Sequence, residues 1–83
     1  MPQIIADLPP LAEFVDLPDL LPQVLHTFPS VDSVRWFVRV HRDELARLGA
    51  VIGITGRLRF HPERFQQAAA EIGRRNVITT HEK

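Results

Sequence analysis

The chain of 83 residues contains no cysteine, so it forms no disulfide bond and no metal site built on thiolates. It also has no stretch that approaches the roughly 18 uncharged apolar residues of a membrane-spanning helix. The first residues, MPQIIADLPP, lack the basic and apolar blocks of a secretory signal. From these absences we expect one small domain in the cytoplasm, with no membrane partner.

Motifs of catalysis and cofactor binding are also missing. The sequence has no GxxxxGK[ST] phosphate loop, no GxSxG and no GxGxxG. Its four histidines fall in separate predicted elements, with no spacing that would gather them on one metal ion: His26, His41, His61 and His81. We therefore expect neither an enzyme nor a protein with a metal or another cofactor.

The formal net charge is zero, but the charges are distributed unevenly along the chain. Residues 1–30 contain four acidic side chains and no basic one, namely Asp7, Glu13, Asp16 and Asp19. Residues 31–83 contain all ten basic residues and the other six acidic ones, so this part carries a charge of +4. Such asymmetry is typical of a basic binding face. The alternative is a solvated, arginine-rich surface without a partner.

Prolines and capping signals divide the chain into three parts. Residues 1–18 form an acidic, proline-rich N-terminal arm, where we expect extended or irregular backbone because proline disfavours helix in the residue before it. Within this arm, residues 11–15 could form one helical turn or a short strand. We assign residues 19–73 to the folded domain and residues 74–83 to a flexible C-terminal tail.

The folded domain is predicted to be α+β and mostly helical. Apolar residues at helical spacing predict a helix over residues 19–28, with Asp19 as its N-cap. A second helix is predicted over residues 31–48, where Ser30 is the N-cap and Gly49 the left-handed stop. This second helix either continues through residue 42 or bends there and restarts.

Two short β-prone runs between residues 50 and 60 predict a β-hairpin. A loop of three residues would pair apolar side chains with each other, Ile54 with Leu58 and Ile52 with Phe60. A loop of two residues would instead pair the same isoleucines with arginines. We favour the three-residue loop, although such loops usually place glycine last and here it stands in the middle.

A last helix is predicted over residues 62–73, with His61 as its cap and Gly73 as its end. The apolar positions of the three helices and the hairpin together predict a core. Its members are Leu21, Val24, Leu25, Val34, Phe37, Leu45, Leu48, Ile52, Leu58, Phe60, Phe65 and Ile72.

Five arginines are the candidate binding residues. Arg35, Arg39 and Arg42 recur at i, i+4 and i+7, which places them on one face of the second helix, opposite its apolar stripe. Such a row of guanidinium groups is suited to phosphate or base contacts. Arg57 and Arg59 on the hairpin are candidates for contact with the DNA backbone or minor groove.

Four further residues of the second helix have weaker assignments. We expect Ser30 and Ser33 to cap the helix in the first place and to donate hydrogen bonds to phosphate in the second. Trp36 and Val40 lie beside the arginine stripe. We expect both to pack against the first helix or the hairpin.

The run FPSVDSVRWFVRVHRDELARLGAVIGITGRLRFHPERF carries a resemblance that covers roughly half of the chain. The matching parts are the Trp36 helix, Leu48-Gly49-Ala50 before the first strand, Gly56-Arg57 at the turn and Pro62-Glu63-Arg64-Phe65 at the last helix. The run resembles small winged helix-turn-helix proteins of phages and integrative elements, the excisionase and AlpA-like regulators related to the MerR DNA-binding domain. The resemblance implies a two-stranded hairpin as the wing, and DNA binding without catalysis.

Two functional hypotheses follow from the sequence. The first is a sequence-specific protein that binds double-stranded DNA, either an excisionase or a small transcriptional regulator of a mobile element. Its DNA-binding residues would be Ser30, Ser33, Arg35, Arg39, Arg42, Arg57 and Arg59. A domain this small would need a homo-oligomer on DNA, repeated sites, or an integrase or other regulatory protein as partner for tight binding. The second is a protein-interaction module, an antiactivator or adaptor that keeps the fold without binding DNA.

Overall fold

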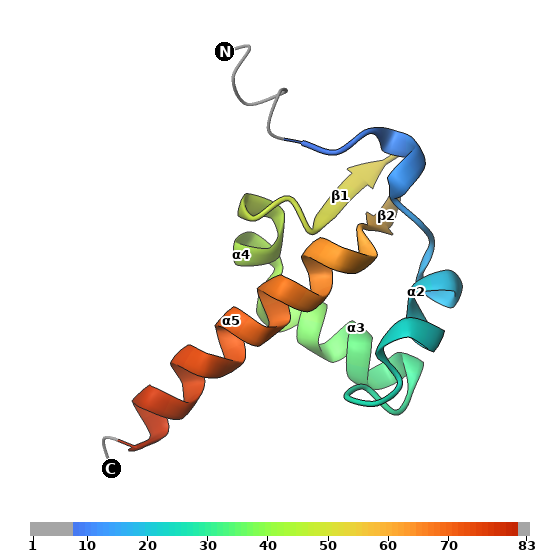
Figure 1. Cartoon of the computed structure of the whole chain (residues 1–83). Coiled ribbons are helices and arrows are strands. Elements are labelled where there is room, and N and C mark those ends of the chain that lie inside the picture. Colours follow the sequence, from blue (N-terminus) through green and yellow to red (C-terminus); the bar gives the residue numbers. More distant parts are fainter. Residues whose placement is uncertain (1–7, 82–83) are drawn as a thin grey trace.

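A computed structural model of the chain describes residues 8–81, with side chains described through residue 77. This part of the chain is α+β and mostly helical, as predicted, with four α-helices and one two-stranded antiparallel sheet (Figure 1). The elements in order are the 3-10 helix η1 (Leu11–Glu13), α2 (Leu17–Val24), α3 (Val31–Val40), α4 (Arg42–Arg47), β1 (Val51–Ile54), β2 (Arg57–Phe60) and α5 (Pro62–His81). Residues 1–7 of the predicted arm and residues 82–83 of the predicted tail lie outside the described residues.

Helix α2 begins and ends earlier than predicted. Its N-cap is Asp16 and not Asp19, because Pro18 falls in the first turn, where its missing N–H has no helical partner. At the other end, the Phe28 N–H donates to the Val24 carbonyl at 2.7 Å, and the residues between them form a turn. Pro29 disfavours helical backbone at Phe28, so the chain leaves the helix before the predicted end.

The second predicted helix is interrupted, which confirms the bend that we considered near residue 42. Helix α3 ends at Val40, and His41 has φ −115° and ψ 28°, outside the helical region. Ser30 caps α3 as predicted. Gly49 follows α4 with φ +74°, a left-handed conformation that glycine adopts without steric cost.

The hairpin has the two-residue loop, so our preferred register was wrong. Ile54 pairs with Arg57 and Ile52 pairs with Arg59. Thr55 has φ 51° and Gly56 has φ 78°. Positive φ at both loop positions is the feature of the two-residue turn whose twist matches that of the flanking strands. The turn geometry therefore decided the register, and not the pairing of apolar side chains.

The N-terminal segment that we left open contributes both a helical turn and an extended pairing. After η1, the Val15 N–H donates to the Phe60 carbonyl at 2.7 Å, and the Phe60 N–H donates to the Val15 carbonyl at 2.8 Å. Phe14 is buried, and its ring meets the His61 ring edge-on, with the two centroids 5.4 Å apart. The residues just before α2 are thus held against β2.

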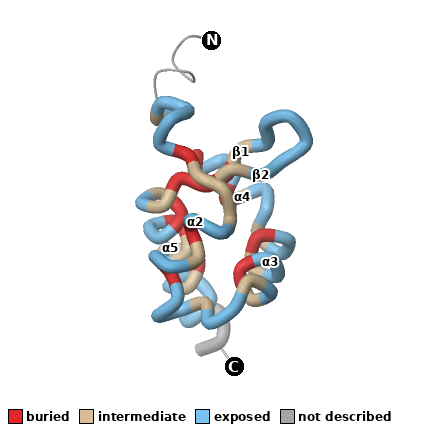
Figure 2. The backbone as a smooth tube through the Cα atoms, turned by 90° about the vertical axis from the view of Figure 1, so that its right-hand side faces the viewer, coloured by how far each residue is buried: buried red, intermediate tan, exposed pale blue. Residues whose placement is uncertain are grey.

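An aromatic cluster lies at the centre of the core. Phe65 of α5 is fully buried, and its ring lies 5.8, 6.1 and 5.9 Å from those of Phe28, Phe37 and Phe60. The buried hydrophobic residues are Phe14, Leu20, Val24, Val34, Val38, Leu45, Ala50, Val51, Phe60, Phe65, Ala68 and Ile72. Figure 2 shows this buried interior and the exposed hairpin turn that projects from it.

Half of the predicted core residues are buried: Val24, Val34, Leu45, Phe60, Phe65 and Ile72. Leu21 and Phe37 are partly buried and pack against the core. Ile52 is half-buried as well. Three predictions were wrong, because Leu25, Leu48 and Leu58 are exposed. Leu25 and Leu48 each follow the last residue of a helix. Helical spacing therefore no longer predicts which way their side chains point.

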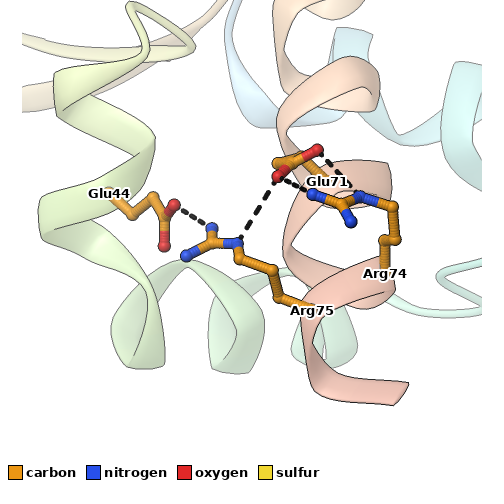
Figure 3. Close-up of polar contacts among 4 residues, drawn as sticks. All are labelled: Glu44, Glu71, Arg74 and Arg75. Atoms are coloured by element: carbon orange, nitrogen blue, oxygen red, sulfur yellow. Dashed lines mark hydrogen bonds and ion pairs between the residues drawn. The ribbon is translucent and has the colours of Figure 1, made fainter. Parts of the chain in front are cut away.

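Helix α5 continues to His81, so the predicted end at Gly73 was wrong. Ion pairs at helical spacing support the continuation, because Arg74 Nη2 lies 2.6 Å from Glu71 Oε2 and Arg75 Nε lies 3.6 Å from the same oxygen. Arg75 also pairs with Glu44 of α4 (Figure 3). The hydrogen bond from Arg74 lowers the pKa of the Glu71 carboxyl.

Candidate nucleic-acid interface

Four of the seven predicted binding residues line one hollow of about 500 Å³. The hollow lies between α3, the start of α2 and the hairpin, and we call it the arginine groove after Arg35, Arg39, Arg42 and Arg57. Its other lining residues are Asp16, Leu17, Pro18, Val34, Val38, Leu58 and Phe60. The groove therefore has basic side chains from three elements, α3, α4 and β2, around a largely apolar floor.

The period of α3 explains why its arginines lie at the border of the core. Val34 and Val38 are buried, and Arg35 and Arg39 directly follow them, about 100° further around the helix. Both arginines are exposed. Arg42 is the first residue of α4, beyond the break, and it still lines the groove. The predicted arginine stripe is therefore a single surface in spite of the interruption.

The two hairpin arginines have different environments, although both lie on β2 near Asp16. The Arg57 side chain is 73% exposed, and its Nη1 lies 3.8 Å from Asp16 Oδ2. The Arg59 side chain is 38% exposed, and its Nη2 donates a hydrogen bond to the Phe14 carbonyl at 2.9 Å. Arg59 Nε lies 3.2 Å from Asp16 Oδ1, as an ion pair without hydrogen-bond alignment. Arg59 thus ties the N-terminal segment to the hairpin, while Arg57 faces solvent.

The two serines act as the cap of α3. The Ser33 N–H donates to Ser30 Oγ, and the Ser30 N–H donates to Ser33 Oγ, both at 3.2 Å. Ser33 Oγ also donates to the Ser30 carbonyl at 2.6 Å. Neither serine lines the arginine groove. Their capping role, which we placed first, is confirmed.

Trp36 and Val40 are exposed on the outer side of α3, so our expectation that they pack against the first helix or the hairpin was wrong. The exposed fractions are 56% for Trp36 and 52% for Val40. Trp36 is two residues from both buried valines, Val34 and Val38, which corresponds to about 200° around the helix. Its side chain therefore points away from the core. Together these two residues form an apolar ridge beside Arg35 and Arg39.

Asp16 is a site residue that the sequence analysis did not identify. It is the one acidic side chain among the described residues that line the arginine groove. Although Asp16 is the N-cap of α2, its side chain makes no capping hydrogen bond and turns to Arg57 and Arg59 instead. The partners are more than 40 residues apart in sequence, at a separation where no spacing rule applies. The only available signal was the acidic N-terminal part of the chain.

A second hollow of about 420 Å³ lies at the corner between α3 and α4. Arg39 and Arg42 extend from the arginine groove to this corner, where Arg47 joins them. Asp43 and Glu44 also line it, and Glu44 pairs with Arg75. Opposite charges are therefore mixed in the second hollow, which makes it a weaker candidate for an anionic ligand.

Neither a metal site nor a membrane-spanning helix is found in the part of the chain that the structure describes. No group of three or more histidine or acidic side chains there could hold a metal ion. Among the described helices, none is long and apolar enough to cross a membrane. Comparisons of the chain with models of protein families, with curated proteins and with solved structures found no match.

Proposed function

We propose that the protein binds double-stranded DNA through the arginine groove. The observation that carries this proposal is the convergence of Arg35, Arg39 and Arg42 with Arg57 of the hairpin on one exposed surface. Guanidinium groups pair well with phosphate oxygens and with the edge of guanine. A surface with four of them and one carboxylate attracts a polyanion, even though the net charge of the chain is zero.

The proposed complex is that of a winged helix-turn-helix. Helix α2 and helix α3 are the two helices of the motif, and α3 enters the major groove, which is about 12 Å wide and admits a helix. Arg35 and Arg39, with the ridge of Trp36 and Val40, then face the base edges. The hairpin is the wing, and Arg57 beside its turn meets the sugar-phosphate backbone.

We further propose the biological role that the sequence resemblance implies. The protein is an excisionase or a small transcriptional regulator of a mobile element, and it acts without catalysis of its own. Half to two-thirds of protein–DNA hydrogen bonds go to phosphate and sugar, and an interface built on so few arginines is modest. Tight binding therefore requires a second copy on neighbouring sites, or an integrase bound beside it.

Fluorescence anisotropy with a labelled DNA duplex tests the proposal. We expect wild-type protein to bind duplex DNA at about 50 mM salt and to lose affinity steeply toward about 200 mM, since each neutralised phosphate contributes about −0.9 to the log–log slope. DNA from the flanks of the gene and a duplex of random sequence should be compared, because a sequence-specific protein prefers one of them. Absence of binding to both duplexes at low salt would refute the proposal.

A pair of arginine variants localises the interface. Arg39→Ala removes the central arginine of the groove and should cost about 1 to 3 kcal/mol with loss of sequence preference if Arg39 contacts a base. If Arg39 contacts a phosphate, the loss is uniform among sequences and the salt slope falls by about one. The matched control is Arg74→Ala, which removes the same charge from α5, outside the groove. Equal binding by the two variants would contradict the assignment of the groove.

A protein-interaction module is the second candidate, and two observations favour it. The floor of the groove is apolar, with Leu17, Val38 and Leu58 among its residues. The exposed ridge of Trp36 and Val40 is a second apolar surface beside it. A protein that binds no duplex at low salt, and that purifies from its native cells in a complex which Trp36→Ser disrupts, would support this alternative.

A further inference from the structure

Asp16 places a carboxylate inside the surface that we propose for DNA. Its two oxygens lie 3.8 Å from Arg57 Nη1 and 3.2 Å from Arg59 Nε. The Asp16 backbone carbonyl accepts hydrogen bonds from Asp19 and Leu20 at the start of α2, so the backbone of Asp16 is held by the helix. Because the side chain makes no capping bond, its contacts with the two arginines are its described polar interactions.

We infer that Asp16 occupies the place of a DNA phosphate at Arg57 and so sets the affinity of the arginine groove. This inference rests on the proposed function, because it concerns the same site. A carboxylate and a phosphate both present oxygens to a guanidinium group, and they compete for it. DNA binding therefore requires Arg57 to exchange its contact with Asp16 for a contact with phosphate.

The exchange takes place at Arg57 and not at Arg59. The Arg57 side chain is 73% exposed, and its distance to Asp16 is the longer of the two. Arg59 is more buried and also holds the Phe14 carbonyl at 2.9 Å, so its movement would detach the N-terminal segment from the hairpin. Asp16 thus has a fixed partner in Arg59 and an exchangeable partner in Arg57.

The exchange has a consequence for the salt dependence of binding. A phosphate that pairs with an arginine releases a condensed cation into solution. When Arg57 leaves Asp16, however, the carboxylate keeps only Arg59 as a partner and attracts a cation more strongly, and this uptake cancels part of the release. Removal of the carboxylate should therefore increase the affinity at low salt and make the salt slope steeper, by up to about one for this single contact.

The test is Asp16→Asn, measured by anisotropy with a duplex of random sequence. Asparagine keeps the N-cap preference and the size of the side chain but removes its charge. We expect the variant to bind the duplex about two- to fivefold more tightly than wild type, the range of a solvent-exposed ion pair. The matched control is Asp19→Asn, which makes the same change of net charge on α2 outside the groove and should leave the affinity close to wild type.

A double variant assigns the gain to Arg57. In an Arg57→Ala background, Asp16→Asn should no longer increase the affinity, because the competing contact is gone. Equal affinity of Asp16→Asn and wild type, or an equal gain from Asp19→Asn, would overturn the inference while the proposed function stands. If the wild-type protein binds no duplex, the inference and the proposed function both fail. Should Asp16→Asn not fold, Asp16→Ser, which also caps helices, replaces it in the same comparison.

Discussion

The aromatic cluster of the core and the arginine groove have two elements in common, α3 and β2. Helix α3 contributes Phe37 to the cluster and Arg39 to the groove. Strand β2 contributes Arg57 to the groove and Phe60 to both, because Phe60 packs on Phe65 and also lines the groove. On α3, Phe37 and Arg39 belong to different sites because they lie at different angles around the helix. On β2, neighbouring side chains point to opposite faces of the strand. A substitution can therefore change the free energy of unfolding or the binding of a ligand, depending on a shift of one or two residues.

The largest effect should come from the centre of the aromatic cluster. Phe65→Ala removes a fully buried ring that lies near three other phenylalanine rings, and the cavity should cost about 3 to 5 kcal/mol of unfolding free energy. Urea unfolding followed by circular dichroism measures the loss. Leu25→Ala is the control, because Leu25 is 50% exposed. A Phe65→Ala protein that melts within a few degrees of wild type would show that the cluster does not hold the fold.

Val38 and Arg39, two neighbouring residues of α3, give the sharpest test of the difference between the core and the arginine groove. Val38→Ala truncates a buried side chain that also lines the arginine groove, and it should cost about 1.5 to 3 kcal/mol of stability. Because it removes no charge, the folded fraction should lose less DNA binding than Arg39→Ala does. Arg39→Ala should change stability by less than about 0.5 kcal/mol and weaken DNA binding. Thermal unfolding and anisotropy on both variants separate the two properties. If Arg39→Ala were the more destabilising of the pair, Arg39 would stabilise the fold and would not be a residue for binding alone.

Local signals in the sequence were enough to predict much of the fold. Ser30 and Ser33 at the start of α3, Gly49 after α4 and Pro62 at the start of α5 lie where capping rules place them. Rules of this kind depend on residues within a turn of each other. They can be read from the sequence because the interactions they describe are local.

Features that depend on distant residues or on backbone geometry could not be read in the same way. Strand β1 carries apolar residues on both faces, whereas β2 alternates arginine with apolar residues, and matching the apolar residues of the two strands favoured the wrong register. The observed register goes with a two-residue turn that has positive φ at Thr55 and Gly56. The approach of Asp16 to Arg57 joins segments that only the folded chain brings together. The outward position of Trp36, by contrast, follows from helix geometry. We missed it because we gave the hydrophobicity of Trp36 more weight than its angular position around the helix relative to Val34 and Val38.

A pair of glycines should show effects of opposite sign. Gly49→Ala places a side chain at φ +74°, where an added Cβ would lie 2.4 Å from Arg64 Nη1, and should destabilise by about 1 to 2 kcal/mol. Gly73→Ala lies inside α5 with no atom within 4 Å of the added Cβ, and should stabilise by up to about 1 kcal/mol. Chemical unfolding of the two variants measures both values. Destabilisation by Gly73→Ala would mean that α5 does not continue as a helix through this position.

The smallest effect concerns charges that belong to neither the core nor the groove. Glu71, Arg74 and Arg75 pair on the exposed side of α5 (Figure 3). The hydrogen bond from Arg74 holds the pKa of the Glu71 carboxyl below its usual value in the folded state. The carboxylate therefore contributes stability above the usual glutamate pKa of about 4.3, and this contribution is lost as the pH falls through the lower folded value.

Glu71→Gln tests this contribution through the pH dependence of the melting temperature. The variant should melt slightly below wild type at about pH 6, and the difference should shrink as the pH falls through the lowered pKa of the Glu71 carboxyl, because the wild-type side chain then loses its charge as well. In an Arg74→Ala background the difference at the higher pH should shrink, because the main cause of the shift is absent. A difference that stays constant across this range would trace the effect of Glu71 to packing or helix propensity. The charge of Glu71 would then have no measurable part in stability.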